Sequence, residues 1–167
     1  MWRHRADFPG LARAPTAPRP LVRLPAFVLT GLVGGAISGW LFDRGHALAA
    51  PGLYGSTAAE SAALYAGSVL AQEAIARMCF LTLLAAFLRR PRAALVLHAL
   101  WTTFFTFTLE RRFLHAGALP EGLDWAGLAF GLAANLLFGG AYASYGLAGS
   151  ALTHAAWNLK LLFLRGA

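Results

Sequence analysis

The chain has 167 residues, of which 58% are apolar and 13% are charged, and its net charge is +7. Ordinary globular chains have about 45–50% apolar and about 25% charged residues, so this composition nearly rules out a water-soluble enzyme. It also excludes a disordered tail, because such segments are poor in apolar residues. The arginines stand at the edges of apolar runs, so we expect membrane lipids, and no nucleic acid, as the partner of the positive charge.

Residues 1–24 form a basic, proline-rich arm in which we expect no stable helix. The uncharged stretch 25–42 is the first predicted membrane span. A signal peptide is the alternative, because Ala47-Leu48-Ala49 resembles a cleavage site, but the stretch exceeds the usual apolar region of roughly 7–15 residues. Within this span three glycines recur at every fourth position, which predicts close approach by another helix: they are Gly31, Gly35 and Gly39.

A capping box, Thr57-Ala-Ala-Glu60, predicts the start of a second helix that runs to Leu88. Such a helix is about 46 Å long at 1.5 Å per residue. It exceeds the hydrocarbon core of roughly 30 Å, so we expect it to tilt or to project beyond the membrane. Its middle carries Gln72, Glu73 and Arg77.

Three further spans are predicted after the arginine-rich turn 89–92. They cover residues 93–109, 125–146 and 147–164. The connection before residue 147 is very short, so the last two helices should pack as antiparallel neighbours. The predicted fold is therefore all-α, a polytopic transmembrane bundle of about five spans, with residues 25–167 as a single domain behind the arm.

The distribution of arginine also predicts the orientation of the bundle. The arm holds five arginines and the turn 89–92 holds three, whereas the two loops on the opposite side have few or balanced charges. Positive loops stay in the cytoplasm. We therefore expect a cytoplasmic N-terminus in the plasma membrane of a bacterium.

Ionisable groups inside a membrane are costly, so each needs a partner or a function. Glu73 and Arg77 stand four residues apart, which places an ion pair on one helix face. His154 and Asn158 also share a face, and His98 lies inside the third span. Taken singly, each of these is explained by packing: a structural ion pair, interhelical hydrogen bonds and a satisfied core histidine.

Together these side chains are the parts of a water-activating site. A carboxylate can take a proton from water, and a histidine can share that work or protonate the leaving group. An asparagine amide can hold an oxyanion. Glu73, His98 and the pair His154–Asn158 come from three different predicted helices. Their expected depths in the membrane allow these side chains to converge in the cytoplasmic half of the bundle.

Two short motifs resemble those of a known family. The segment Gln72-Glu73-Ala74-Ile75-Ala76-Arg77 resembles the Glu-Glu-x-x-x-Arg motif of the CPBP intramembrane endopeptidases, which include the CAAX prenyl proteases and the bacteriocin-processing (Abi) proteins. The segment His154-Ala155-Ala156-Trp157-Asn158 resembles their His-x-x-x-Asn motif. The stretch 138–147 resembles the small-residue turn that precedes the last helix, and the resemblance covers residues 58–164.

The resemblance implies peptide-bond hydrolysis within the membrane, on a peptide or prenylated-peptide substrate. It implies Glu73 as the base, His154 as its partner and Asn158 as the oxyanion donor, with Arg77 as a structural counter-ion. His98 is a weaker catalytic candidate. Family members are often called metalloproteases, and a glutamate with two histidines could hold zinc, but the ligand spacing in this chain does not require a metal.

Two positions depart from the family pattern. Gln72 replaces the first glutamate, which is the one usually assigned to activate water, and glutamine cannot act as a base. The family's Phe-x-x-x-His motif would end at Thr106, and His98 lies about two helical turns earlier. Either Glu73 and His98 substitute for the missing groups, or the protein keeps the scaffold and has lost the chemistry.

Two other classes of function remain open at this point. The first is a non-catalytic membrane partner, such as a maturation or immunity factor on the same scaffold. The second is a haem or proton carrier in which His98 and His154 are axial ligands or relay groups. The sequence leaves the substrate, the metal state and the oligomeric state open.

Overall fold

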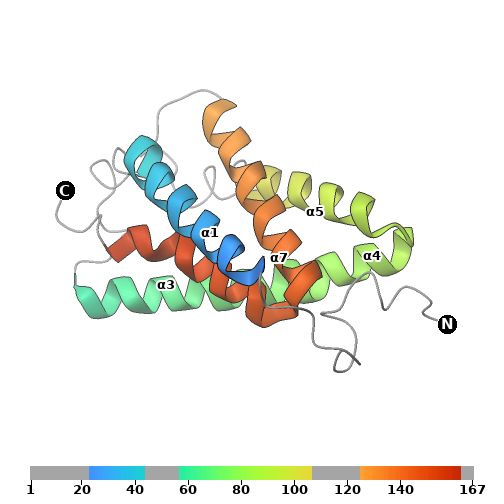
Figure 1. The fold of residues 1–167 in the computed structure, drawn as a ribbon, viewed down its shortest axis with the longest axis horizontal. Coiled ribbons are helices and arrows are strands. Elements are labelled where there is room, and N and C mark those ends of the chain that lie inside the picture. Colours follow the sequence, from blue (N-terminus) through green and yellow to red (C-terminus); the bar gives the residue numbers. More distant parts are fainter. Residues whose placement is uncertain (1–22, 44–56, 107–124, 163–167) are drawn as a thin grey trace.

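The computed structural model describes residues 23–43, 57–106 and 125–162, and within these ranges it has helices and no strands (Figure 1). Three helices are long and apolar enough to cross a membrane: Leu24–Phe42, Ala59–Leu88 and Trp125–Asn158. The all-helical fold is therefore confirmed. The predicted arm, apart from its last two residues, and the two longer loops lie outside the described residues.

Helix α1 (Leu24–Ser38) continues into a short π-helical segment, η3 (Gly39–Asp43), and packs against the second half of α7. A Cβ atom on Gly31 would lie 2.6 Å from the carbonyl oxygen of Thr153, and one on Gly35 would overlap the carbonyl oxygen of Trp157. The two backbones can approach this closely only because both positions are glycine. The close approach predicted from the glycine spacing is thus confirmed.

The second helix is continuous from Ala58 to Leu88 but changes its winding. It comprises α3 (Ala58–Gln72), the π-helical segment η5 (Glu73–Leu81) and α4 (Thr82–Leu88). The predicted capping box is present, because the Thr57 hydroxyl accepts from the Glu60 amide and the Glu60 carboxylate accepts from the Thr57 amide, each at 3.2 Å. The helix ends at Arg89, which has a φ of 52°.

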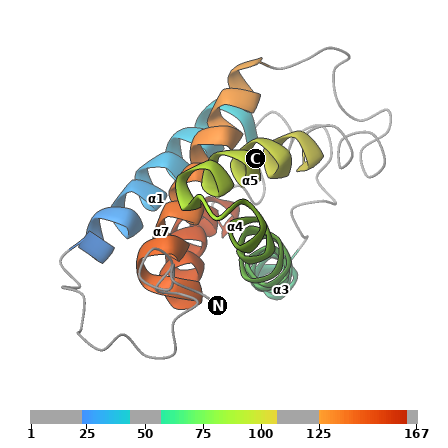
Figure 2. The ribbon, with the colours of Figure 1, turned by 90° about the vertical axis from the view of Figure 1, so that its right-hand side faces the viewer.

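Helix α5 (Pro91–Phe105) follows α4 after a tight turn and packs against α4, η5 and α7. It is the core of the third predicted span, whose residues 107–109 lie outside the described ranges. Figure 2 shows α5 alongside the first, orange part of α7, with α3 and α4 below.

Helix α7 (Trp125–Asn158) is bent sharply at Gly146, where φ is 72° and ψ is −164°. Glycine is the residue that adopts this conformation without a steric penalty. The two arms fold back on each other, since the Ser150 hydroxyl donates to the Phe138 carbonyl at 2.9 Å and the Phe130 and Trp157 rings lie 5.6 Å apart. The predicted antiparallel contact of the last two helices is confirmed.

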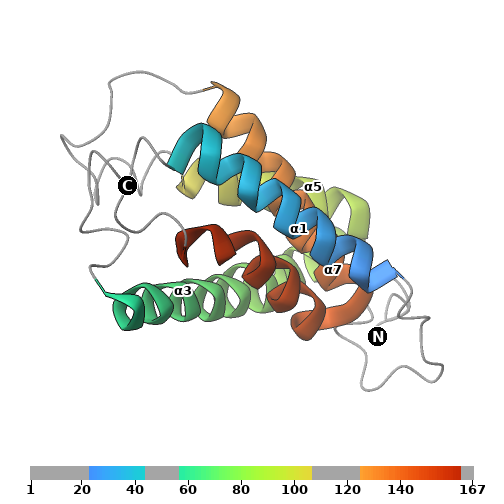
Figure 3. The ribbon, with the colours of Figure 1, turned by 60° about the vertical axis from the view of Figure 1, so that its left-hand side comes forward.

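The second arm of α7 lies between α1 and α3 and ends in a 3₁₀ turn, η7 (Leu159–Leu162) (Figure 3). The Tyr65 hydroxyl on α3 donates to the Ala155 carbonyl on this arm at 2.6 Å. The arm is therefore held on both sides, by glycine packing against α1 and by a hydrogen bond to α3. This position brings His154 against the centre of the second helix.

The distribution of side chains differs from that in a water-soluble protein. Large apolar residues are exposed along the helices, among them Leu70, Ile75, Phe87 and Trp101, whereas Glu73, Arg77 and His98 are at most 2% exposed. Charged side chains are almost never fully buried in soluble proteins unless they are paired. Exposed apolar side chains around a core that encloses charged groups are the pattern that lipid as solvent favours.

Candidate functional site

The centre of the candidate site is the predicted ion pair on the second helix. Arg77 Nη1 lies 3.3 Å from Glu73 Oε1, and the two side chains are 0% and 2% exposed. Because neither charge reaches solvent, each depends on the other for compensation. The pair predicted from the spacing of these two residues is confirmed.

Both residues lie in η5, where the backbone winds with more residues per turn than an α-helix. A stripe of buried positions runs along the second helix at intervals of four residues, except that the half-buried Tyr65 interrupts it between the first two members. Its members are Ser61, Val69, Glu73, Arg77, Leu81 and Ala85. In an α-helix of 3.6 residues per turn such a stripe drifts around the axis. The wider π winding reverses that drift, so the ion pair stays on the buried face.

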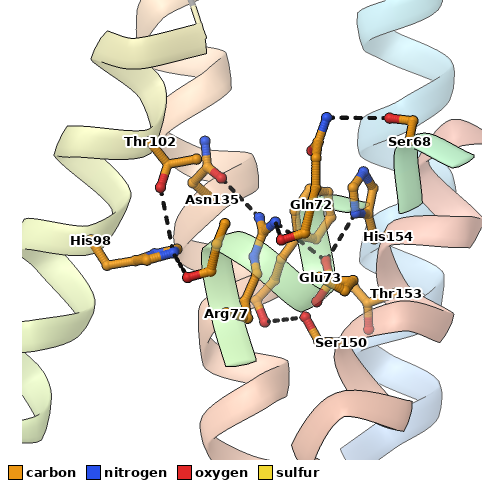
Figure 4. Close-up of polar contacts among 12 residues, drawn as sticks. Ser68, Gln72, Glu73, Arg77, His98, Thr102, Asn135, Ser150, Thr153 and His154 are labelled. Carbon is orange, nitrogen blue, oxygen red and sulfur yellow. Dashed lines mark hydrogen bonds and ion pairs between the residues drawn. The ribbon is translucent and has the colours of Figure 1, made fainter. Parts of the chain in front are cut away.

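His154 reaches the ion pair from the second arm of α7. Its Nδ1 atom lies 2.9 Å from Glu73 Oε1, a contact between residues 81 positions apart in the chain (Figure 4). The imidazole stacks on the Phe138 ring with centroids 4.6 Å apart and an interplanar angle of 18°. The Arg77 guanidinium lies over the same ring, 5.3 Å from its centroid. Phe138 thus supports both partners of the carboxylate.

Arg77 is held by a second set of contacts to neighbouring helices. Its Nη2 atom donates to Asn135 Oδ1 at 2.8 Å. The Asn135 amide in turn donates to the Thr103 hydroxyl and to the Gly131 carbonyl, each at 3.1 Å. Arg77 therefore connects the second helix to α7, and through Asn135 to α5. Asn135 is a polar residue inside the apolar stretch 125–146, and this is the signal that the sequence carries for it.

Three buried polar atoms of this region have no hydrogen-bond partner among the described residues: Glu73 Oε2, Arg77 Nε and His98 Nδ1. Buried polar groups are nearly always paired, and exceptions often have a catalytic or ligand-binding cause. Ser150 lies beside Glu73 (Figure 4), but its hydroxyl donates to the Phe138 carbonyl. The second carboxylate oxygen therefore retains its capacity to accept a hydrogen bond.

The remaining predicted site residues are placed differently. His98 is fully buried, and its Nε2 atom lies 2.8 Å from the Ala76 carbonyl, so it contacts the backbone of η5 rather than Glu73. Gln72 is exposed, and its amide donates to Ser68 at 3.2 Å. Asn158 is 8% exposed and lies one turn beyond His154, outside the hydrogen bonds that join Glu73, Arg77 and His154.

A zinc site does not follow from this arrangement. Within the described residues no group of three or more histidine, cysteine, aspartate or glutamate side chains gathers in a way that could hold a metal ion. Glu73 and His154 are in contact, but the Nε2 atom of His98 is engaged by a carbonyl. The described residues therefore do not fit a protein-bound zinc ion.

Comparison of the chain with protein-family models, with curated proteins and with solved structures gave no match. The resemblance to the CPBP family therefore rests on the two motifs in the sequence. In the fold, the glutamate of the first motif and the histidine of the second are the two residues that meet at 2.9 Å.

Proposed function

We propose that the chain is a five-span membrane protein on the scaffold of the CPBP intramembrane endopeptidases, with a cytoplasmic N-terminus in a bacterial plasma membrane. The five spans are α1, the continuous helix from α3 to α4, α5 and the two arms of α7. Three long apolar helices and the apolar exterior support this arrangement. The exposed arginines at the α4–α5 turn support the orientation.

We further propose that the chain hydrolyses a peptide bond within the membrane, and the contact between Glu73 and His154 carries this proposal. A carboxylate and an imidazole in direct contact are a common acid–base pair. Here the pair lies in a buried, low-dielectric region. Fixed charges and dipoles stabilise developing charge more strongly in such a region than in water. Arg77 compensates the carboxylate, and Phe138 supports the imidazole.

The substrate is a peptide or prenylated peptide that enters from the lipid or from the cytoplasmic side. Asn158 lies one helical turn from His154 and supplies the amide that holds the oxyanion. His98 is not assigned a catalytic contact, because its Nε2 atom is engaged by the Ala76 carbonyl. The proposed reaction needs only the side chains of this site, so no metal or organic cofactor is required.

A non-catalytic membrane partner is the second candidate, and the environment of Gln72 favours it. The amide stands where the family has its water-activating glutamate, and it is exposed and bound to Ser68. Thr106 stands where the family has its middle histidine. A protein with both changes would bind a prenylated peptide as a maturation or immunity factor without cleaving it.

Turnover of prenylated and unmodified peptides by the purified full chain in proteoliposomes separates the two candidates. We expect His154→Ala to abolish cleavage while the protein remains folded, and Gln72→Glu to increase it by restoring the first carboxylate. Gln72→Leu is the matched control, because it removes the amide without adding a carboxylate, and it should not increase turnover. Binding without cleavage by the natural protein and by Gln72→Glu would refute the protease and support the partner.

A further inference from the structure

Two buried histidines face different acceptors through different ring nitrogens. The Nε2 atom of His98 faces the Ala76 carbonyl at 2.8 Å, and the Nδ1 atom of His154 faces the Glu73 carboxylate at 2.9 Å. Carbonyl and carboxylate oxygens only accept hydrogen bonds, so the facing nitrogen must carry the hydrogen. A neutral imidazole has a single N–H. His98 is therefore the Nε2–H tautomer and His154 the Nδ1–H tautomer.

This assignment requires Glu73 to be ionised, and its surroundings support that state. A guanidinium keeps its charge in proteins, and Arg77 Nη1 lies 3.3 Å from the same oxygen that His154 contacts. One carboxylate then balances one guanidinium, and a neutral His154 leaves the buried group without net charge. A protonated His154 would add an uncompensated charge inside the bundle, which is costly in a membrane.

We infer that Glu73 is a positioning residue that holds His154 as the Nδ1–H tautomer, and that His154 Nε2 is the atom that takes a proton from water. This inference rests on the proposed function but reverses the roles that the motifs imply. Glu73 Oε1 forms the ion pair with Arg77 and accepts from His154, whereas the other ring nitrogen of His154 points away from the carboxylate (Figure 4). Phe138 holds the plane of the ring.

The proton transfers balance without any further reactant. His154 Nε2 takes a proton from water as the water oxygen bonds to the peptide carbonyl carbon. The tetrahedral intermediate then breaks its C–N bond, and the proton on Nε2 passes to the leaving nitrogen. The products are a carboxyl group and an amine, and His154 returns to its starting tautomer. Glu73 stays ionised throughout and stabilises the imidazolium that forms between the two steps.

The tautomers can be measured without any substrate. Full-length protein labelled with ¹⁵N-histidine in detergent micelles contains five histidines, and two-bond ¹⁵N–¹H correlation spectra distinguish Nδ1–H from Nε2–H rings. His98→Gln and His154→Gln variants assign the two signals. We expect opposite tautomers, with Nδ1–H for His154 and Nε2–H for His98. An Nε2–H ring at His154 would overturn the inference.

A matched pair of double variants tests the positioning role of Glu73. Glu73→Gln with Arg77→Met and Glu73→Leu with Arg77→Met both remove the buried ion pair, but only the glutamine keeps an oxygen that can accept from His154. The glutamine form should keep the Nδ1–H tautomer and measurable turnover. The leucine form should lose the tautomer, with turnover about 10⁴-fold below the natural protein, the loss seen when a catalytic triad holds the wrong tautomer.

The outcomes of this comparison separate the inference from the proposed function. Identical His154 spectra in the two double variants would overturn the positioning role. A glutamine form that keeps the tautomer but has no turnover, while the natural protein cleaves, would identify Glu73 itself as the base and also overturn it. If no form cleaves any peptide but the tautomers follow the expectation, the proposed function fails and the positioning of His154 by Glu73 stands.

Discussion

The buried ion pair makes the strongest prediction about stability. Glu73 and Arg77 are almost fully inaccessible and lie 3.3 Å apart, so removing either charge leaves the other uncompensated. The perturbations are Arg77→Met and Glu73→Gln, singly and together. Methionine keeps much of the length of arginine, and glutamine keeps the shape of glutamate, so neither change opens a large cavity.

The magnitude follows from the charge rather than from the hydrogen bonds. Breaking a buried pair by removing one partner costs about 3–5 kcal/mol. Interhelical hydrogen bonds in membranes average only about 0.6 kcal/mol, so losing the bond from Arg77 to Asn135 adds little. The double variant contains no uncompensated charge. Its loss of stability should therefore be smaller than the sum of the two single losses by at least about 3 kcal/mol.

Unfolding in mixed micelles with increasing detergent denaturant, followed by the fluorescence of the five tryptophans, measures these differences. Arg92→Met is the matched control, because Arg92 is exposed at the start of α5 and its loss should change stability by less than about 0.5 kcal/mol. If the stability lost by the double variant equals the sum of the two single losses, the buried ion pair is refuted. An Arg77→Met variant as stable as the control would also refute it.

Three further predictions concern topology and packing. A topology reporter fused after residue 48 should lie outside the cell and one fused after Arg92 inside, and the opposite pattern would contradict the five-span arrangement. Gly35→Ala should sharply lower the yield of folded protein, because its Cβ would overlap the Trp157 carbonyl. The control is Gly67→Ala, whose Cβ meets nothing within 4 Å and which should be neutral or stabilising by up to about 1 kcal/mol. Equal yields of the two variants would refute the contact of α1 with α7. Gly146→Ala should destabilise the bend by about 1–3 kcal/mol in the same unfolding assay, and an unchanged midpoint would show that no positive φ is needed there.

Local patterns predicted those features that depend on local chemistry. The capping box placed the start of the second helix because the side chains of Thr57 and Glu60 each accept from the other's backbone amide. The four-residue glycine spacing predicted a close helix contact because it makes one helix face flat. The Glu73–Arg77 pair followed from the same kind of spacing.

The parts of the site that sequence reasoning missed depend on how one helix is rotated against another. Gln72 is exposed and Glu73 is buried, because neighbouring residues point in different directions around a helix, and the motif does not say which of the two faces the neighbouring helices. Asn135 became part of the site because α7 presents it to Arg77. His98 is directed toward the second helix, but its imidazole contacts the Ala76 carbonyl rather than Glu73. The spacing of a motif cannot reveal such a contact.

The proposed hydrolysis, in which water is the nucleophile and His154 is required, can be tested in one measurement. The natural protein and His154→Ala, each in proteoliposomes, are incubated with a prenylated peptide in H₂¹⁸O, and the products are analysed by mass spectrometry. We expect one ¹⁸O atom in the new C-terminal carboxyl group with the natural protein and no such product with His154→Ala. Absence of the labelled product from the natural protein, or its equal formation by His154→Ala, would contradict the proposed hydrolysis.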